Sequence, residues 1–295
     1  MTRHRHYTFN RAPFESFRAF NRAGTLLASP GTPLKYYSSV NHPSSGTGRR
    51  TSVDRLMEIG GRLREFPFVW KMGAFVLRAA SEPCRARQIR RYLYSSDKRQ
   101  LRFGSGRHTD AEWLSADIIP LSRGIVYMDA RKPLPLPSDS FDFILCEHMI
   151  EHLDLRSARH LLEEFARVLR RGGILRIATP DLRRLVLFVT AGVLSDDALT
   201  YVRALNEDVQ GIPQDDGDNP VYMINRVVRD WGHTFLYDEL TLRHLLELAN
   251  FSNIVRGVPG ESEHPKLVGV ERHQEEVGRQ INLIETLLLE AVITK

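Results

Sequence analysis

The residues with the clearest chemical potential stand in one short stretch, Glu147-His148-Met149-Ile150-Glu151-His152. His148, Glu151 and His152 are spaced i, i+3 and i+4, so in a helix they would lie on one face. An imidazole can act as a general base, and two imidazoles with a carboxylate can bind a divalent metal. His233, further along the chain, would extend such a group. General base, metal site and structural hydrogen-bond network all stay open as roles for these four residues.

Three short apolar stretches end in residues suited to binding a nucleoside. Strands are predicted over 101–103, 113–116 and 125–128, and they end in Gly104-Ser105-Gly106, Asp117 and Asp129 respectively. A glycine turn lets a ligand approach the backbone and leaves N–H groups free to bind it. The first aspartate could accept both hydroxyls of a ribose and the second an adenine amino group. Because the carboxyl ends of parallel strands share one sheet edge, we expect a nucleoside-type site there.

Strand and helix signals alternate from residue 99 onward, which indicates an α/β fold with a Rossmann-like doubly wound sheet. Asp238 is expected to cap a helix over 239–249, and a helical stretch that includes Leu161 and Phe165 is expected to stop at 170–173. Residues 182–232 are far longer than an ordinary connection, so we expect helices that form a cap over the sheet edge. Further strands are predicted over 141–146, 174–178, 253–258 and 267–270, and a helix over 280–293.

The charge is unevenly distributed along the 295 residues, whose formal net charge is +5. Residues 1–100 contain 19 Lys and Arg against 6 Asp and Glu, whereas residues 101–295 contain 22 against 30. The basic arm allows peripheral contact with an anionic surface such as a membrane. Nucleic acid is disfavoured as a partner because the rest of the chain is acidic.

Composition narrows the class of protein further. Apolar residues make up 42% of the chain, and no stretch reaches the roughly 20 uninterrupted apolar residues of a membrane-spanning helix. The two cysteines, Cys84 and Cys146, are far apart, which argues against a disulfide scaffold or zinc ribbon and suits a reducing, cytoplasmic location.

The ordered series of motifs resembles the class I S-adenosylmethionine-dependent methyltransferases, and more narrowly the predicted bacterial methyltransferases associated with polysaccharide biosynthesis. The resemblance covers about residues 98–273. The matching stretches are Leu101–Gly106, Glu112–Asp117, Leu136–Asp142, Glu147–Leu153, Arg167–Gly173, Arg176–Leu182, Tyr237–Leu240 and Gly260–Glu263.

The resemblance implies a set of cofactor contacts. Gly104, Ser105 and Gly106 would form the turn at the methionine end of S-adenosylmethionine, with Asp117 on the ribose. The adenine would lie against Asp129 and Ala130, and the methionyl side against Cys146 and Glu147. Arg102 departs from the family pattern, because an acidic residue usually stands two positions before the first glycine.

The organisation that follows is a disordered basic arm over 1–52, a basic amphipathic helical segment over 53–97, and a methyltransferase domain over 98–273 with its cap at 182–232. A helical segment over 274–295 would dock on the domain or pair with a second subunit in a homodimer. The expected activity is methyl transfer from S-adenosylmethionine to an oxygen of a small molecule or glycan. Two alternatives stay open: a catalytically inactive S-adenosylmethionine-binding scaffold and an RNA methyltransferase.

Overall fold

The computed structural model describes residues 67–95 and 99–295. The predicted disordered arm over 1–52, and the first part of the predicted helical segment over 53–97, lie outside the described residues. The remainder of that segment is helix α3, Pro67–Ser95.

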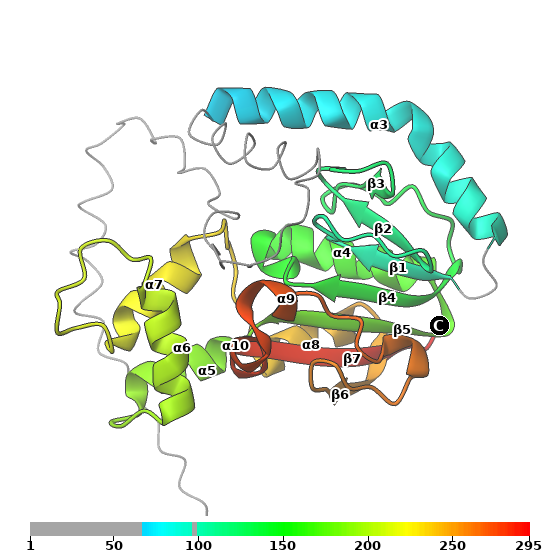
Figure 1. Ribbon diagram of the computed structural model, residues 1–295. Coiled ribbons are helices and arrows are strands. Elements are labelled where there is room, and N and C mark those ends of the chain that lie inside the picture. Colours follow the sequence, from blue (N-terminus) through cyan, green and yellow to red (C-terminus); the bar gives the residue numbers. More distant parts are fainter. Residues whose placement is uncertain (1–66, 96–98) are drawn as a thin grey trace, which may run out of the picture. The chain divides into compact units, whose positions relative to one another are not determined.

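A seven-stranded sheet forms the centre of the described chain, in the order β3-β2-β1-β4-β5-β7-β6 (Figure 1). All neighbouring pairs up to β5 are parallel, and β7 runs antiparallel to both β5 and β6. This arrangement confirms the predicted Rossmann-like fold. The strands are β1 Gln100–Phe103, β2 Trp113–Asp117, β3 Ile125–Tyr127, β4 Phe141–Glu147, β5 Leu169–Pro180, β6 Phe251–Arg256 and β7 Thr286–Ile293.

The register of the central strands brings the motif-bearing ends together. Phe103, the last residue of β1, pairs with Ala116 of β2 and with Cys146 of β4. Gly104, which follows β1, therefore lies level with Asp117 and Glu147, the last residues of β2 and β4, at one edge of the sheet. Figure 1 shows that five helices gather at this edge: α5 Leu182–Thr190, α6 Asp196–Asn206, α7 Pro220–Arg229, α9 Gln274–Val277 and α10 Arg279–Glu285.

Two helices, α4 Leu155–Val168 and α8 Glu239–Leu248, cover the sheet on the face where the larger core forms. The described chain also contains α9 Gln274–Val277, α10 Arg279–Glu285 and the single turns η2 Ile150–His152 and η3 Pro265–Leu267. Asp154 begins α4, and its side chain accepts a hydrogen bond from the N–H of Ser157. Asp238 caps α8 in the same way, accepting from Thr241, which confirms the predicted start of that helix.

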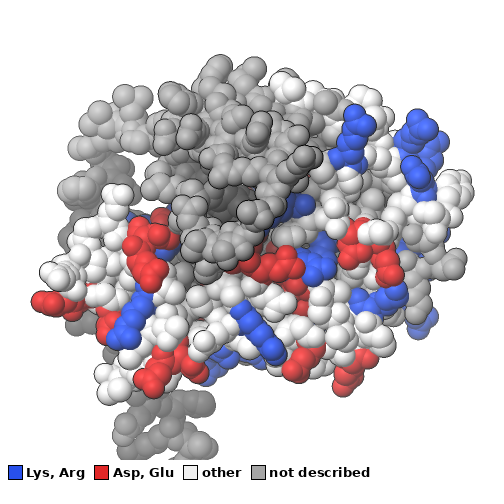
Figure 2. All heavy atoms as spheres, viewed as in Figure 1, with Lys and Arg blue, Asp and Glu red and all other residues white. Residues whose placement is uncertain are grey.

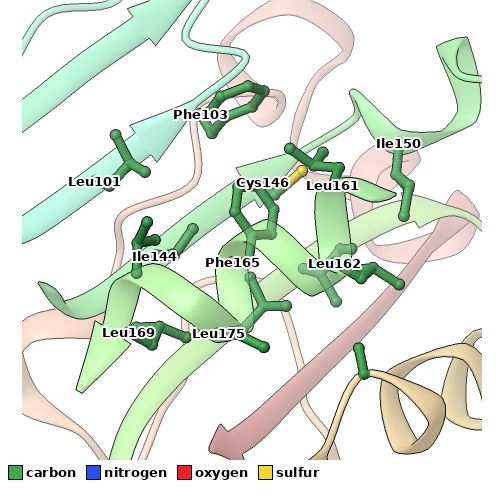
Figure 3. Close-up of a cluster of buried hydrophobic side chains, with 14 of the residues drawn as sticks. Leu101, Phe103, Ile144, Cys146, Ile150, Leu161, Leu162, Phe165, Leu169 and Leu175 are labelled. Carbon is green, nitrogen blue, oxygen red and sulfur yellow. The ribbon is translucent and has the colours of Figure 1, made fainter. Parts of the chain in front are cut away.

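Apolar side chains from the sheet and from α4 interlock in this larger core (Figure 3). Leu161, Leu162 and Phe165 recur at helical spacing along α4 and are fully buried against β1, β4 and β5. Phe165 meets Phe103 edge to face, with ring centroids 5.3 Å apart. Burying an apolar side chain of this size contributes about 1.5–3 kcal/mol to the stability of the fold. The packing of α4 therefore stabilises the sheet whose strand ends carry the site residues.

The opposite face carries a smaller apolar cluster and a buried ion group. Trp113, Leu145 and Ile174 of the sheet pack against Leu267 and Val270, which belong to the segment that follows β6. Arg176 of β5 is fully buried there and pairs with Glu271 and with Glu290 of β7. The segment over 257–273 is thus attached to the sheet by charge as well as by apolar contact.

The long excursion after β5 is helical, as expected of a cap. It contains α5 Leu182–Thr190, α6 Asp196–Asn206 and α7 Pro220–Arg229. These helices have their own apolar cluster, built on Leu185, Tyr201 and Met223, to which Ile281 and Ile284 of α10 add.

Two predictions for the C-terminal part were wrong. The expected helix over 280–293 ends at Glu285, and Thr286–Ile293 is strand β7, inserted between β5 and β6. A continuous apolar run such as Leu287-Leu288-Leu289 suits a buried helix and a buried strand equally, and here the open hydrogen-bonding edges of β5 and β6 decide for the strand. The strand expected over 267–270 is absent: the turn η3 ends at Leu267, and Gly269 has a φ of 66°, which an extended strand does not allow.

The described surface has mixed charge on the face drawn in Figure 2, where acidic and basic side chains alternate. Within residues 67–95 and 99–295, no helix combines the length and the apolar character that a membrane span requires.

Candidate functional site

The turn after β1 approaches its neighbours closely. Gly104 and Gly106 have φ angles of 75° and 56°, in the region that favours glycine. The N–H groups of Gly104 and Ser105 donate to the carbonyl of Ala116 at 2.9 and 3.0 Å, which holds the turn against the end of β2. The hydroxyl oxygen of Ser105 is buried and has no hydrogen-bond partner among the described residues. A polar ligand seated on this turn would supply one.

Replacing Gly104 by alanine is expected to damage this turn. A Cβ at Gly104 would lie 2.4 Å from Cγ of Met149, so Met149 or the backbone must move. We expect a lower melting temperature and a weaker affinity for S-adenosylmethionine, measured by thermal unfolding and calorimetry.

Gly172→Ala is the matched control. Gly172 has almost the same φ, 76°, but nothing lies within 4 Å of its would-be Cβ. It should lose only the roughly 1–2 kcal/mol of left-handed strain and keep its ligand affinity. Equal losses of stability and of ligand affinity in the two variants would show that the close approach of Met149 to Gly104 is not the cause of the effect.

Asp117 stands at the end of β2, where its carboxylate accepts two backbone hydrogen bonds. Oδ2 accepts from the N–H of Gly106 at 2.9 Å, and Oδ1 from that of Ile119 at 2.8 Å. Burial raises the pKa of Asp117, although the hydrogen bonds from Ile119 and Gly106 oppose that rise. The carboxylate therefore joins the ends of β1 and β2, and each oxygen keeps a lone pair for a ligand hydroxyl.

Asp129 follows β3 at the same edge, but its carboxylate is engaged by a neighbour. Arg131 donates to both of its oxygens at 2.9 Å. Burial acts to raise the pKa of Asp129, yet the hydrogen bonds and charge of Arg131 outweigh it and the pKa is lowered. The carboxylate lines a groove of about 630 Å³ between α3 and β3, together with Ala79, Glu82, Arg85, Tyr127, Lys132, Pro133 and Pro135. Ala130, next in sequence, is buried in the core.

The two residues at the end of β4 are placed differently from one another. Cys146 is fully buried in the core among Phe165 and its neighbours (Figure 3), and burial raises the pKa of its thiol well above the usual value. Its side chain thus points away from the sheet edge. The carboxylate of Glu147 accepts hydrogen bonds from the N–H groups of Arg272 and His273 at 2.8–3.0 Å.

Arg102 is buried on the opposite face of the sheet from the core. Its guanidinium donates to the carbonyl of Val270 at 2.9 Å and lies 4.0 Å from Glu147. Burial lowers the pKa of Arg102, with the charge of Glu147 acting in the other direction. The cation that replaces the family's acidic residue therefore forms part of the attachment of the 257–273 segment.

The stretch after β4 is not the helix that the spacing predicted. Only Ile150–His152 forms a turn, η2, and His148 precedes it with a φ of 43°. His148, Glu151 and His152 therefore do not share one helix face, because a single 3₁₀ turn is too short to align them. His148 and Glu151 are nevertheless close, with Nδ1 of the first 3.4 Å from Oε1 of the second.

His233 reaches Glu151 and His152 through a tight turn after α7. Trp231 and Gly232 have φ angles of 57° and 81°, which reverses the chain. The N–H groups of Thr234 and Phe235 then donate to the carbonyl of Glu151 at 2.8 and 3.2 Å. The rings of His152 and His233 meet edge to face, 4.9 Å apart. One ligand atom from each of Glu151, His152 and His233 lies within 4.8 Å of the others, so three of the four predicted residues form one cluster.

Burial and neighbouring charge set the protonation of this group. Burial acts to raise the pKa of Glu151, but His148, His152 and His233 lower it to about 2. Burial lowers the pKa of His233, with the charge of Glu151 opposing it. The cluster thus combines an ionised, buried carboxylate with an imidazole that is neutral near pH 7.

His148 belongs to a second group with residues that the sequence did not single out. Its ring stacks on that of His273, 3.7 Å between centroids, and its Nε2 lies 3.2 Å from Oγ1 of Thr286. Glu285 accepts from His273 at 2.5 Å and from the hydroxyl of Tyr201 in the cap at 3.0 Å. In the sequence, ionisable side chains are concentrated at 271–276, around His273. Their spacing matches no pattern that would have predicted a site.

The residues at the sheet edge fit S-adenosylmethionine. The turn at Gly104 has no room for a side chain, Ser105 presents an unpartnered hydroxyl, and Asp117 retains lone pairs beside them. These are donors and acceptors for the amino-acid and ribose parts of such a cofactor.

Comparison with known proteins agrees with this chemistry. Residues 103–177 match the family model described as a methyltransferase domain. The match runs from the end of β1 to within β5 and includes the glycine turn, both aspartates and η2. Over these residues the chain is therefore similar to a methyltransferase domain, and a Rossmann-like sheet carries the matched segment.

Solved structures of low sequence identity also align with the chain. A phosphoethanolamine N-methyltransferase 2 of Haemonchus contortus, in complex with phosphomonomethylethanolamine and S-adenosylhomocysteine, is 13% identical with a TM-score of 0.40; the alignment covers 68% of this chain and 49% of that one. A SAM-dependent methyltransferase of Archaeoglobus fulgidus is 19% identical with a TM-score of 0.40, covering 77% and 99%. A possible histamine N-methyltransferase of Thermotoga maritima is 15% identical with a TM-score of 0.39, covering 78% and 97%. The chain thus spans about half of the Haemonchus protein, and no curated protein matches it by sequence.

Proposed function

We propose that this chain transfers a methyl group from S-adenosylmethionine to an oxygen atom of a small molecule or glycan. The observation that supports it is the cluster of Glu151, His152 and His233. The charge of His152 acts to lower the pKa of Asp117, so the cluster lies within electrostatic reach of the residue proposed to bind the ribose.

The acceptor oxygen sets the chemical requirement. When bound, S-adenosylmethionine supplies a methyl group on a sulfonium sulfur, which keeps the bonding electron pair as the acceptor takes the methyl. A hydroxyl acceptor must also lose its proton, since a neutral hydroxyl is a weak nucleophile. An imidazole that accepts the proton, or a cation that lowers the hydroxyl pKa, meets this need, and both use the same three residues.

The proposed division of roles follows burial. Gly104, Ser105, Gly106 and Asp117 hold the cofactor, and Asp129 with Ala130 borders the adenine. His152 and His233 are half-buried and face the acceptor, whereas Glu151 is fully buried and acts on it through them. His148 positions the carboxylate of Glu151 through its ion-pair contact. The cap formed by α5–α7 shapes the acceptor pocket.

Incubation of the purified chain with methyl-labelled S-adenosylmethionine and fractionated cell extract tests the proposal. We expect label in a small-molecule or glycan fraction. Alkaline hydrolysis then separates an ester, which releases label, from an ether, which retains it. Label on RNA, on a nitrogen or on a carbon contradicts the proposal, and so does cofactor binding without transfer to any fraction.

Asp117→Ala is expected to weaken S-adenosylmethionine binding at least about tenfold, because a hydrogen bond to a charged group is worth about 1.5–3 kcal/mol. Calorimetry on both proteins measures the change, with a thermal melt to confirm that the variant is folded. Asp215→Ala, in an exposed loop of the cap, is the control. Equal affinities of Asp117→Ala and the unmodified chain would remove Asp117 from the cofactor site.

A further inference from the structure

Among the described residues, two groups place three potential metal ligands close together. One comprises His148, His273 and Glu285, and the other comprises Glu151, His152 and His233. Both groups lie near the end of β4, but they differ in the hydrogen bonds that their potential ligand atoms already make.

The donors of the first group are already engaged. Nε2 of His273 and Oε1 of Glu285 are hydrogen-bonded to each other at 2.5 Å, and the other carboxylate oxygen of Glu285 accepts from Tyr201. Nε2 of His148 lies 3.2 Å from Oγ1 of Thr286, and its Nδ1 faces Oε1 of Glu151 at 3.4 Å, which is an ion-pair distance and not a hydrogen bond. A cation would have to break several of these contacts in a place where His148 and Glu285 are buried.

Glu151 in the second group carries an oxygen without a donor. Oε2 accepts from the hydroxyl of Thr179 at 3.0 Å, which fixes the carboxylate. Oε1 is buried and accepts no hydrogen bond from the described residues, and its 3.4 Å separation from Nδ1 of His148 is an ion-pair distance. Leaving a charged oxygen buried without a donor costs free energy, and a metal ion would satisfy it.

His233 is oriented as metal-binding histidines usually are. Its Nδ1 lies 2.6 Å from the carbonyl oxygen of Val227, which can only accept, so Nδ1 carries the hydrogen. The lone pair is therefore on Nε2. A carbonyl that fixes the tautomer of a ligating imidazole in this way is a common companion of metal sites. The left-handed turn at Trp231 and Gly232 holds the ring in place.

We propose that Glu151, His152 and His233 bind a divalent transition-metal cation through one oxygen and two nitrogen atoms. Two neutral imidazoles and one carboxylate leave the site with a single negative charge. This donor set occurs in catalytic zinc sites and suits Zn²⁺ and its neighbours, such as Co²⁺ and Mn²⁺. The ligand atoms, now within 4.8 Å of one another, would move closer around the ion.

The site would remain open on one side. Glu151 is fully buried whereas both histidines are half-buried, so the remaining coordination positions would lie on the partly exposed, histidine side of the group. This role rests on the proposed function: a cation held by Glu151, His152 and His233 would lower the pKa of an acceptor hydroxyl, so that its proton could pass to water before the oxygen accepts the methyl group.

Direct metal binding tests the site without cofactor or acceptor. The full chain, treated with a chelator and freed of it, is titrated with Co²⁺ while visible absorption is recorded, and with Zn²⁺ by calorimetry. We expect visible bands of low-symmetry Co²⁺ and a binding event that His233→Gln and Glu151→Gln each weaken at least about tenfold. His273→Gln, from the first group, and His244→Gln, on the exposed face of α8, should bind as the unmodified chain does.

Three results would overturn the proposal: no cation binding, binding that His233→Gln and Glu151→Gln leave unchanged, or binding that is lost in His273→Gln instead. Thermal melts identify any variant that fails to fold, and His152→Gln then replaces it. Failure of the proposed function is separate. Metal binding without label transfer to oxygen removes the activity and keeps the site, whereas transfer that survives the chelator keeps the activity and removes the cation's role in it.

Discussion

Methyl transfer by the His233→Ala variant is expected to fall by about 10²–10⁴-fold, the range that removal of proton-transfer assistance usually costs. The same loss follows if the imidazole ligates a cation, because the cation leaves with it. Affinity for S-adenosylmethionine should stay within about twofold, since the proposed cofactor residues at Gly104 and Asp117 belong to other strand ends. Label transfer and calorimetry on the same preparation measure both quantities.

The contrast between the two readouts distinguishes a role in the reaction from a structural one. His233 also anchors its turn through Val227, so a misfolded turn would lower both transfer and stability. His244→Ala, on the exposed side of α8, should change neither. If His233→Ala retains methyl transfer, the cluster does not assist removal of the proton from the acceptor hydroxyl. Oxygen then ceases to be the favoured acceptor atom.

The fold was predictable where local signals and tertiary packing agree. The glycine turn after Phe103, the cap at Asp238 and the apolar spacing along α4 each specify one structure by short-range rules. Thr286–Ile293 shows the limit of those rules. Its leucines satisfy a helix pattern, and its conformation depends on β5 and β6, whose adjoining residues lie more than 30 positions away in the sequence.

The candidate site was predictable in its residue types and only partly in its geometry. Glu151 and His152 were found from their spacing, although the helix that motivated the spacing is a single turn. His233 joins them because backbone hydrogen bonds from Thr234 and Phe235 attach its loop to Glu151, a contact with no sequence signature. His273, whose ring stacks on His148, ends the segment over 257–273, whose position depends on a buried ion group, and its partner Glu285 is the last residue of α10.

Arg176→Met is expected to lower the free energy of unfolding by about 3–5 kcal/mol, measured by urea denaturation. Arg176 is fully buried and pairs with Glu271 and Glu290, which are 2% and 15% exposed. Methionine fills a similar volume but leaves both carboxylates without their cation in a poorly solvated place. Glu271 also accepts from the N–H of Gly260, so its segment should loosen as well.

A matched pair of controls tests whether burial is the cause. Arg203 also donates two hydrogen bonds to carboxylate oxygens, both of Asp218, at 2.6 and 2.8 Å. Both side chains are more than half exposed, so Arg203→Met should leave the denaturation midpoint unchanged. Arg176→Met combined with Glu271→Gln and Glu290→Gln removes the stranded charges and should recover much of the loss. Equal effects of Arg176→Met and Arg203→Met would contradict the argument.

Arg176→Met should also affect the site, because Arg176 anchors the segment over 257–273 through Glu271. Glu271 immediately precedes Arg272 and His273, whose N–H groups donate to Glu147 at the end of β4. If the segment loosens, Glu147 loses these donors and His273 no longer stacks on His148. We therefore expect Arg176→Met, in the fraction that remains folded, to weaken S-adenosylmethionine binding, while the charge-free triple variant restores stability and binding together. Recovered stability without recovered binding would show that the segment acts on the site by its charge and not by its position.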